Sequence, residues 1–529
     1  MRGRFVEGFG NARFSAVLAL DSCELSLVID NRPVNNSAEP SRLPSGVPGL
    51  DSILSGGLPK GHMYLVEGKP GTGKTTVGMQ FLLEGRRTGE RCLYVTLSES
   101  KAELEATAQS HDWSLDGISI AEFVPDEASI SEEEHYTVFH PAEVELASTI
   151  KRLLAEIEQL KPERLVIDSL SEFRLLAQDP VRYRRQLLAL KQYFSGHNTT
   201  VLLLNDQSSD GDDQQIVSIM HGVIRLSNIP RSYGVTRRHL EVVKIRASAY
   251  REGNHDYSLN QRGMVVYPRL IAAEHEEDFP NEHLCSNLPA LDAMFAGGIE
   301  RGSSTLILGP PGAGKSTIAM QYAHAAAGRG ERAVLYSFDE TLRTAKMRAR
   351  SLGMQIDSGI EKQRLCLEQV DAAELSPGEF AGKIVREVEE KNARVVVIDS
   401  LNGFLRSMPG EGDLALHLHE LLASLNQKGV NTFLILTQRA LLGEGGTDNI
   451  DVSYLADTLV ILRYFEAEGA VHRAISVLKK RSGEHEHTIR ELRFGPQGIQ
   501  LGEPLVGFRG VLSGTPDFII VPEPKSDES

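Results

Sequence analysis

Two glycine-rich segments carry the residue types and the spacing that hold a nucleoside triphosphate. Residues 68–75 read GKPGTGKT, and residues 309–316 read GPPGAGKS. Glycines in such a loop let backbone N–H groups converge on a phosphate, the lysine reaches the β- and γ-phosphates, and the hydroxyl that follows ligates Mg²⁺. We expect ATP and Mg²⁺ to bind at both loops. The expected ATP-binding residues are Gly68, Gly71, Thr72, Gly73, Lys74, Thr75, Thr76, Gly309, Gly312, Ala313, Gly314, Lys315, Ser316 and Thr317.

The neighbouring sequence favours nucleotide binding over a glycine turn that only caps a helix. Each loop follows an apolar run typical of a strand, at residues 64–66 and 305–308. Each loop also opens an apolar stretch typical of a helix, at residues 77–83 and 318–325. This order of strand, loop and helix is the context that a phosphate-binding loop requires.

Two aspartates are placed to complete a metal site. Asp168 and Asp399 each end a short apolar run, in the sequences LVID and VVID. A carboxylate at the end of a buried strand meets the magnesium shell of a nucleotide, so Thr75 with Asp168 and Ser316 with Asp399 are the expected metal residues. The alternative is that each aspartate caps the helix that follows it. The phosphate-binding loop upstream favours the metal role.

A glutamate stands at the same distance from the lysine of each loop. Glu99 follows Lys74 by 25 residues, and Glu340 follows Lys315 by 25 residues. A carboxylate on the strand next to the phosphate-binding loop can orient the attacking water or hydroxyl, which makes both glutamates candidate catalytic bases. The alternative is a solvated acidic residue at the start of a loop, but the identical spacing favours catalysis.

Two pairs of basic residues lie late in the chain's two halves. Lys244 with Arg246 and Lys479 with Arg481 are two residues apart on expected strands, so each pair shares one face. We interpret them as catalytic cations supplied to the γ-phosphate of a neighbouring subunit. The alternative is an edge strand whose lysine prevents aggregation.

These repeated features indicate a tandem duplication. Lys315 follows Lys74 by 241 residues, and the entry segments at residues 46–61 and 287–302 resemble each other. The polar stretch at residues 274–282 marks the boundary between the repeats. Short β-branched runs without alternation suit strands buried on both faces of a parallel sheet. The sequence thus predicts an α/β fold of two tandem RecA-like P-loop domains with central, mostly parallel sheets.

Composition narrows the function classes. The chain has 529 residues, of which 41% are hydrophobic, and this is too much apolar content for a wholly disordered protein. It carries 56 Lys and Arg against 72 Asp and Glu, for a net charge of −16. This balance disfavours a protein whose main task is to neutralise nucleic-acid phosphates.

The chain also lacks the usual signs of export or membrane insertion. Its four cysteines are far apart, which indicates neither a zinc knuckle nor a disulfide framework. The longest apolar run is the five residues 16–20, whereas a spanning helix needs about 20. We interpret the N-terminus as a disordered extension rather than a signal peptide, and we expect a cytoplasmic protein.

Two P-loop units with these flanking motifs resemble the KaiC family, within the RecA/DnaB-like ATPases. The resemblance runs from about residue 43 to residue 519 and includes the entry motifs, the glutamates, the K-x-R pairs and a C-terminal LSGTP at residues 512–516. It implies a nucleotide-dependent, double-ring homohexamer. Its first domain would hydrolyse ATP slowly and drive assembly, and its second domain would phosphorylate its own Ser and Thr residues across the subunit interface.

The chain departs from the family pattern at three places. The family's two adjacent catalytic glutamates are Ser98-Glu99 and Asp339-Glu340 here, which puts the rate in question. The family's Ser-Thr phosphoacceptors align with Ser453-Tyr454, so Ser453 remains the candidate acceptor. The tail after residue 519 is short and acidic, which argues against a KaiA-like partner and leaves a KaiB-like partner open.

The function that the resemblance implies is an ATPase with serine/threonine autokinase activity and a signalling or clock-type role. The alternatives are a RecA/RadA-like DNA-dependent ATPase and a scaffold in which nucleotide only holds subunits together. Neither a membrane nor nucleic acid is an expected partner. The expected divisions are an N-terminal extension (1–42), a first ATPase domain (43–273), a linker (274–283), a second ATPase and autokinase domain (284–519) and a tail (520–529).

Overall fold

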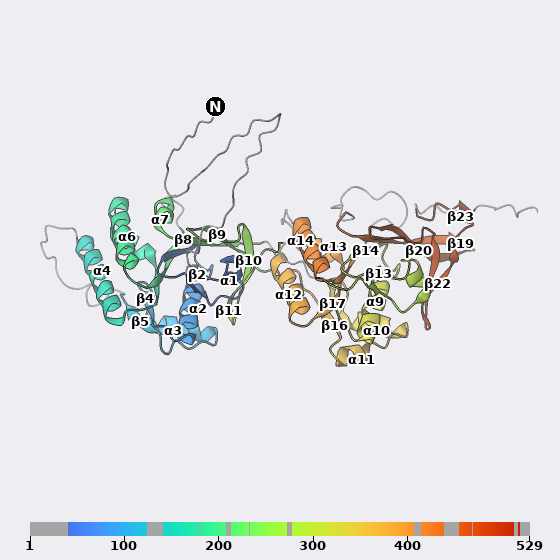
Figure 1. The fold of residues 1–529 in the computed structure, drawn as a ribbon, viewed down its shortest axis with the longest axis horizontal. Coiled ribbons are helices and arrows are strands. Elements are labelled where there is room, and N and C mark those ends of the chain that lie inside the picture. The colour runs from blue at the N-terminus through green and yellow to red at the C-terminus, as the bar shows by residue number, and fades with distance from the viewer. Residues whose placement is uncertain are drawn as a thin grey trace, which may run out of the picture. The chain divides into compact units, whose positions relative to one another are not determined.

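The computed structural model describes most of the chain from Ser41 onward (Figure 1). The expected phosphoacceptor Ser453, the N-terminal extension up to residue 40 and the acidic tail lie outside the described residues. Arg42, the last residue of the expected extension, is the first residue of β1. The described residues are 41–123, 141–177, 179–207, 213–231, 233–271, 278–406, 414–437, 454–467, 469–512 and 517–518.

The first half of the described chain alternates strands and helices as the sequence predicts. Its elements are β1 (Arg42–Leu43), α1 (Leu50–Ile53), β2 (Leu58–Pro59), β3 (Met63–Gly68), α2 (Lys74–Arg87), β4 (Cys92–Thr96), α3 (Lys101–Ser110), β5 (Ser119–Glu122), α4 (Pro141–Leu160), β6 (Arg164–Asp168), α5 (Leu170–Ala177), α6 (Pro180–Ser195), β7 (Thr200–Asp206), α7 (Asp213–Ile219), β8 (Gly222–Ile229), β9 (Arg237–Ile245), β10 (Asn254–Asn260) and β11 (Gly263–Tyr267).

The second half repeats this order. Its elements are β12 (His283–Leu284), α8 (Pro289–Ala293), β13 (Ile299–Glu300), β14 (Ser304–Gly309), α9 (Lys315–Arg329), β15 (Arg332–Ser337), α10 (Leu342–Ser351), α11 (Ile356–Glu361), β16 (Leu365–Gln369), α12 (Pro377–Glu389), β17 (Ala393–Asp399), α13 (Leu401–Arg406), α14 (Leu414–Gln427), β18 (Asn431–Thr437), β19 (Thr458–Ala467), β20 (Ala470–Lys480), β21 (Arg490–Gly495), β22 (Gly498–Pro504), β23 (Phe508–Arg509) and β24 (Asp517–Phe518).

Each half builds one nine-stranded sheet, and the two sheets have the same topology. The strand order is β5-β4-β6-β7-β3-β8-β9-β10-β11 in the first sheet and β16-β15-β17-β18-β14-β19-β20-β21-β22 in the second. The strands from β5 to β8 pair in parallel, and β9 to β11 extend the sheet in antiparallel fashion. The predicted fold of two tandem RecA-like domains with mostly parallel sheets is confirmed.

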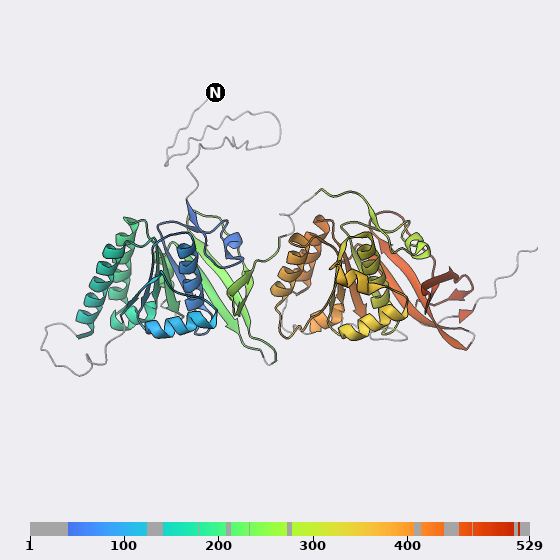
Figure 2. The same cartoon turned by 90° about the horizontal axis from the view of Figure 1, so that it is seen from below.

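The parallel strands of the first sheet are buried on both faces. Alternate residues of β3 divide between two hydrophobic clusters: Tyr64 and Val66 pack with residues of α2, whereas Met63 and Leu65 pack with residues of α4, α5 and α6. Helices accordingly lie on both sides of the sheet (Figure 2). This double coverage explains why the strands read as continuous apolar runs.

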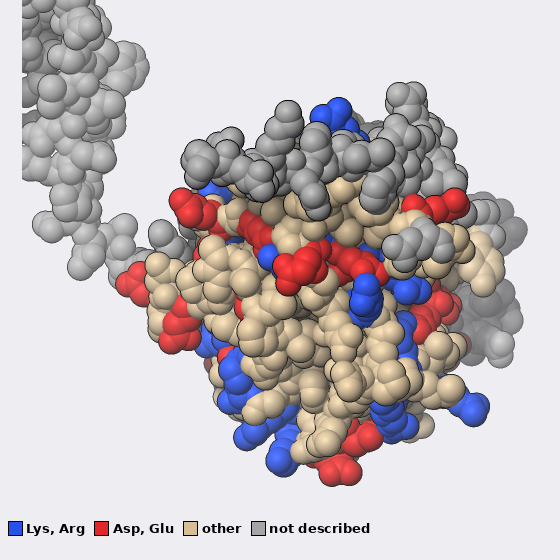
Figure 3. Space-filling model, turned by 90° about the vertical axis from the view of Figure 1, so that its right-hand side faces the viewer, with Lys and Arg blue, Asp and Glu red and all other residues tan. Residues whose placement is uncertain are grey.

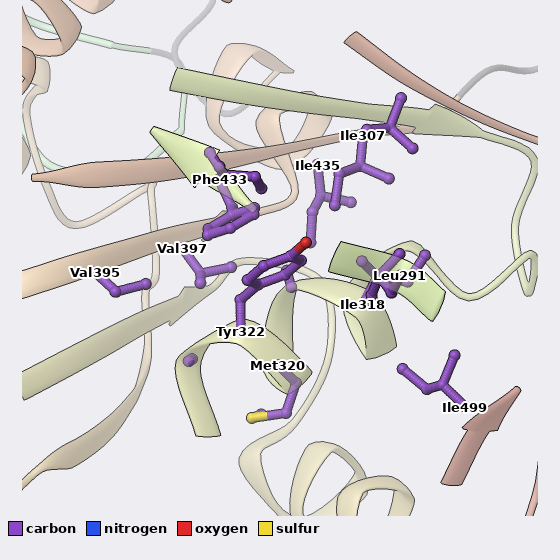
Figure 4. Packing of buried hydrophobic residues seen from close by; sticks show 14 of the residues in the cluster. Leu291, Ile307, Ile318, Met320, Tyr322, Val395, Val397, Phe433, Ile435 and Ile499 are labelled. Carbon is purple, nitrogen blue, oxygen red and sulfur yellow. The ribbon is translucent and has the colours of Figure 1, made fainter. Parts of the chain in front are cut away.

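The second sheet is covered in the same way. Tyr322 of α9 stacks on Phe433 of β18 with ring centroids 5.0 Å apart (Figure 4), and Ile307 and Val397 lie in the same cluster. The opposite face packs against α12 and α14, through residues such as Phe380. The helix that follows each phosphate-binding loop is therefore held against the sheet by a close-packed core.

A fully buried arginine joins several elements of the first domain. Arg164, at the start of β6, is 0% exposed and forms an ion pair with Glu90. Its Nη1 donates to the carbonyl oxygens of Pro44 and Phe81 at 2.8 and 2.9 Å. The guanidinium also lies 4.6 Å from the centroid of the Phe81 ring. A buried cation is tolerated here because it is both paired and hydrogen-bonded.

Candidate functional site

The first glycine-rich loop joins the end of β3 to the start of α2, at the carboxyl ends of the parallel strands. Gly71 and Gly73 have φ values of 78° and 93°, which glycine adopts without strain. A Cβ on Gly73 would lie 2.8 Å from the Leu259 side chain. Thr72 is fully buried, and its hydroxyl donates to the Lys69 carbonyl at 2.8 Å. The loop therefore has the narrow, glycine-dependent shape that its motif predicts.

The lysine of the first loop has all of its donors engaged. Its Nζ donates to the carbonyl oxygens of Gly68 and Lys69 at 3.0 and 3.2 Å. It also lies 2.7 Å from Oδ1 of Asp206, at the end of β7. An ammonium has three N–H donors, so these three acceptors satisfy Lys74. A phosphate that binds Lys74 must compete with the Asp206 carboxylate.

The expected metal residues of the first site are in direct contact. Thr75 Oγ1 donates to Asp168 Oδ2 at 2.9 Å, and Tyr94 Oη donates to the same oxygen at 2.6 Å. Burial raises the pKa of Asp168, and these two hydrogen bonds offset part of that rise. A hydroxyl and a carboxylate are the hard oxygen ligands that Mg²⁺ prefers, so the residues present fit this ion.

Glu99 leaves β4 just before α3 and is held there through its backbone. Thr96 Oγ1 donates to the Glu99 carbonyl at 2.6 Å and accepts from the Glu99 N–H at 3.0 Å. Glu99 Oε2 is buried and has no hydrogen-bond partner among the described residues. Burial raises the pKa of Glu99, and the charges of Asp168 and Glu103 add to the rise. A desolvated carboxylate with a free oxygen suits a general base.

The second loop repeats this geometry with one difference at the lysine. Lys315 Nζ donates to the carbonyl oxygens of Gly309 and Pro310 at 2.9 and 2.8 Å. Burial lowers the pKa of Lys315 to about 8. In the sheet register, Gly68 pairs with Asp206 and Gly309 pairs with Thr437. The carboxylate that pairs with Lys74 is thus replaced by a threonine at the second site.

The other glycines and the metal residues of the second site match the first. Gly314 has φ 106°, and a Cβ there would lie 2.1 Å from the Phe494 ring. The Ser316 hydroxyl hydrogen-bonds to Asp399, and burial raises the pKa of this carboxyl. The expected pair of metal residues therefore meets at both sites. The remaining loop residues expected to contact ATP occupy the same strand-to-helix turns: Thr76, Gly312, Ala313 and Thr317.

The second glutamate differs from the first in its partners. Arg348 of α10 places Nη1 2.6 Å from both carboxylate oxygens of Glu340. The neighbouring Asp339 accepts a short hydrogen bond from Ser400. Ser337 Oγ donates to the Glu340 carbonyl at 2.6 Å, as Thr96 does for the first glutamate. The backbone placement is conserved between the repeats, but the side-chain environment is not.

The basic pairs follow a β-bulge in each domain. The register shifts between β8 and β9 just before Lys244 and between β19 and β20 just before Lys479. The sequence places both members of each pair on a strand. This is wrong for Arg246 and Arg481, which lie one residue beyond the ends of β9 and β20. The bulge and strand end turn the basic residues out of the ladder.

Each basic pair lies at the end of the sheet opposite its own loop. Ile245 pairs with Gly222, which in turn pairs with Tyr64 near the start of β3. The glycine loop begins at Gly68, four residues along the same strand. At about 3.3 Å per residue, this separates the two groups by roughly 13 Å along the sheet. Neither basic pair is placed to reach the phosphates of its own domain.

The first basic pair lies among other nitrogen bases. His62 and His221 stack with ring centroids 3.7 Å apart. Burial lowers the pKa of His221 to about 4, and the charges of His62, Arg246 and Lys191 add to this. Burial and the Arg246 charge also lower the pKa of Lys244. The neighbouring positive charges of Lys244, Arg246 and Lys191 favour an anion at the first basic pair.

The second basic pair has a carboxylate at the position of His221. The Arg246 N–H donates to the His221 carbonyl, and the Arg481 N–H donates to the Asp457 carbonyl, so His221 and Asp457 are equivalent. Arg481 Nη1 lies 3.3 Å from Asp457 Oδ1. Lys479 Nζ donates to the Ala456 carbonyl at 2.8 Å. The two pairs share their backbone position but differ in local charge.

Three polar side chains at these sites escape a motif-based search: Tyr94, Asp206 and Arg348. Tyr94 and Asp206 lie on strands whose register alone brings them to the loop. Arg348 has a weak sequence signal, because it follows Glu340 by eight residues on an expected helix. Among the described residues, no cluster of three or more His, Cys, Asp or Glu side chains forms an additional metal site.

Figure 3 shows the face of the second domain on which β22 and β23 lie in Figure 1. Acidic side chains form a band across its middle, and basic side chains gather mainly toward its lower part. The described residues of this face do not form one continuous basic track, which agrees with the acidic composition. None of the described helices combines the length and the apolar character that crossing a bilayer requires.

The fold and the two loops define a tandem P-loop nucleotide-binding protein. The sequence model of the family described as "ATPase: KaiC" matches residues 43–271 and 285–506. The chain therefore belongs to the KaiC family of ATPases, and the resemblance seen in its motifs is confirmed.

Curated relatives match the chain over most of its length. The circadian clock oscillator protein KaiC of Parathermosynechococcus lividus is 28% identical over 93% of this chain and 92% of its own. The KaiC of Synechococcus elongatus is 26% identical over 93% and 95%. The circadian clock protein KaiC3 of a Synechocystis species is 26% identical over 90% and 95%.

Proposed function

We propose that this protein is an ATP hydrolase that assembles into a homohexamer through its nucleotide sites and phosphorylates its own Ser or Thr residues through the second domain. The observation that carries the proposal is the arrangement at the first loop. There, the contact between Thr75 and Asp168 lies beside a desolvated glutamate, Glu99, with one free oxygen. A signalling or clock-type role follows from family membership and belongs to the proposal.

The loops bind the triphosphate through backbone and lysine. Backbone N–H groups of each loop and the N-terminus of the following helix face the phosphates. Lys74 and Lys315 place their ammonium groups toward the β- and γ-phosphates. Thr75 with Asp168, and Ser316 with Asp399, would hold Mg²⁺, which neutralises charge on the phosphates when it is bound.

The glutamates act on the nucleophile. Glu99 accepts the proton of the attacking water. Its raised pKa makes its carboxylate a stronger base than an ordinary glutamate. Glu340 has the corresponding role toward water or a Ser/Thr hydroxyl in the second domain. Ser98 and Asp339 stand where the family has a second glutamate, so catalysis depends on a single glutamate at each site.

The basic pairs act between subunits. Lys244 and Arg246 lie at the opposite end of the sheet from their own loop, so the phosphates that they reach are those of a neighbouring copy. The same holds for Lys479 and Arg481. Cations supplied in this way stabilise the charge that develops on the transferred phosphoryl group. They also make assembly depend on nucleotide.

ATPase measurements on matched variants test the hydrolase. Glu99→Gln keeps the shape of the side chain and removes the base, so we expect phosphate release from the first site to fall by about 10²-fold or more, with ATP still bound. Lys315→Ala serves as the background, because it silences the second site. Full activity of Glu99→Gln in that background would contradict the role of Glu99.

Assembly and trans action are tested together. We expect the purified protein to shift from monomer to hexamer on adding Mg·ATP, as measured by light scattering coupled to gel filtration. Mixing Arg246→Ala subunits with Glu99→Gln subunits should restore activity, since some interfaces then carry both intact groups. No recovery in confirmed mixed rings would count against trans action.

The autokinase is tested at the candidate acceptor. We expect Lys315→Ala to abolish incorporation of γ-labelled phosphate and Ser453→Ala to reduce it. Full labelling of Ser453→Ala would assign the acceptor elsewhere. Tyr454, which is 53% exposed, is the neighbouring control, because its oxygen lies farther from the backbone than a serine hydroxyl. A KaiB-like protein is the partner to test by pull-down with phosphorylated and unphosphorylated forms.

A further inference from the structure

The two domains differ at the helix position that follows the candidate base by eight residues. Thr107 follows Glu99 by eight residues, and Arg348 follows Glu340 by eight residues. The helices that carry them, α3 and α10, each begin two residues after the glutamate. Thr107 and Arg348 therefore occupy equivalent positions on equivalent helices, and only Arg348 carries a charge that can form an ion pair with a carboxylate.

The arginine engages the whole carboxylate of its glutamate. Arg348 Nη1 lies 2.6 Å from Oε1 and 2.6 Å from Oε2 of Glu340. Such charge-assisted hydrogen bonds are short and strong, and a guanidinium keeps its charge throughout the pH range of proteins. The Glu99 carboxylate, by contrast, keeps one oxygen without a hydrogen-bond partner among the described residues.

We propose that Arg348 is a positioning residue that withholds Glu340 from the attacking nucleophile and so slows phosphoryl transfer at the second site. The inference rests on the proposed function of that site.

The chemistry explains the effect. The nucleophile's oxygen forms a bond to the γ-phosphorus, the bond from the γ-phosphorus to the bridging oxygen breaks, and ADP leaves with that electron pair. The proton of the water or hydroxyl must go to Glu340, which accepts it only through a carboxylate oxygen that faces the nucleophile. With both oxygens on Arg348, this transfer waits until the ion pair opens.

Arg348 contributes little to holding its helix in place. α10 is anchored by the buried Ala345 and Ala349 and capped by Thr341. The Arg348 side chain is 29% exposed. Removing its charge therefore leaves the helix and the backbone position of Glu340 in place. If Arg348 only held the helix in place, its loss would lower kcat, whereas loss of a restraint on Glu340 would raise kcat.

The experiment isolates the second site with Glu99→Gln, which silences hydrolysis at the first site and leaves ATP bound there for assembly. In that background, Arg348→Met keeps the length of the side chain and removes its charge. We expect kcat for ATP hydrolysis and for phosphate incorporation to rise about fivefold, the factor that a partly exposed ion pair is worth, with KM for ATP unchanged. Arg348→Lys should give an intermediate rate. An unchanged or lower kcat for Arg348→Met would overturn the inference.

The reverse substitution, which introduces an arginine at the equivalent position of the first domain, tests the inference even if Arg348→Met does not fold. In the Lys315→Ala background, Thr107→Arg should slow the first site by a similar factor, whereas Thr107→Met should leave its kcat unchanged. Equal rates for the two Thr107 variants would also overturn the inference. If the Glu99→Gln parent and its Arg348→Met variant both fail to turn over ATP, the proposed function of the second site is refuted, whereas a rate that appears only with Arg348→Met supports the restraint.

Discussion

Raising the pH from 7 to 9 should weaken nucleotide binding at the second site, and Lys315 supplies the reason. Its ammonium donates to two carbonyl oxygens, and burial lowers its pKa to about 8. The sign follows from the charged form being the one that attracts phosphate. Below pH 8 the lysine is mostly charged and binds, and above pH 8 it is mostly neutral and loses that attraction.

The expected change in affinity follows from the deprotonation of Lys315 alone. With a pKa of about 8, the charged fraction falls from about 91% at pH 7 to about 9% at pH 9. If only the charged form binds, the apparent Kd rises about tenfold over this range, or about 1.4 kcal/mol. Bound phosphate favours the ammonium, so ADP and ATP should raise the pKa of Lys315 when they bind.

The assay is a fluorescence titration with a labelled ADP in the Lys74→Ala background, repeated from pH 7 to pH 9. Lys315→Arg is the matched control, because a guanidinium does not deprotonate in this range. We expect the Kd of the Lys315→Arg control to change little between pH 7 and pH 9. Any change that it does show measures titration of the nucleotide itself and is subtracted. A flat curve for Lys315, or an equal slope for Lys315→Arg, would refute the reasoning.

Three further substitutions test single contacts. Asp206→Thr removes the partner of Lys74, and because Asp206 is 44% exposed the expected gain in first-site ADP affinity is only about fivefold, measured by titration in the Lys315→Ala background. Gly314→Ala should weaken nucleotide binding and lower the melting temperature, because the new Cβ lies 2.1 Å from Phe494 at a positive φ; unchanged melting would contradict this. Arg164→Met should reduce the free energy of unfolding by about 1–3 kcal/mol in urea titrations, because it removes the ion pair with the partly buried Glu90 and the hydrogen bonds to the Pro44 and Phe81 carbonyls.

The sequence predicts the parts of this molecule whose chemistry is local. The loop at residues 68–75 is recognisable because its glycines, lysine and hydroxyl must be consecutive to surround a phosphate. Asp168 is predictable because it ends a strand that is apolar on both faces. The duplication and the fold class follow from the same signals, which occur twice in the same order.

Contacts that depend on sheet register are not predictable in this way. Asp206 reaches Lys74 only because β7 pairs with β3 so that residue 206 lies opposite residue 68. Nothing in the spacing of the chain fixes that pairing. The bulges before Lys244 and Lys479 also leave no clear trace in the sequence. The sequence therefore predicts strands that reach Arg246 and Arg481, one residue beyond the ends of β9 and β20.

The two sites differ at residues outside the shared motifs. One difference bears on nucleotide binding, and the other bears on the glutamate proposed to accept the proton. At the first site, the lysine is paired with Asp206, while the proposed base Glu99 keeps one oxygen without a hydrogen-bond partner among the described residues. A nucleotide that binds Lys74 must therefore compete with the Asp206 carboxylate, but once bound it meets the proposed base in an available state. At the second site, Thr437 stands at the position of Asp206, and Arg348 pairs with the proposed base Glu340. Under the proposed mechanism, this arrangement favours retention of ATP over its hydrolysis. Under the proposed mechanism, two domains with matching phosphate-binding motifs divide binding and hydrolysis between them through one charged residue each.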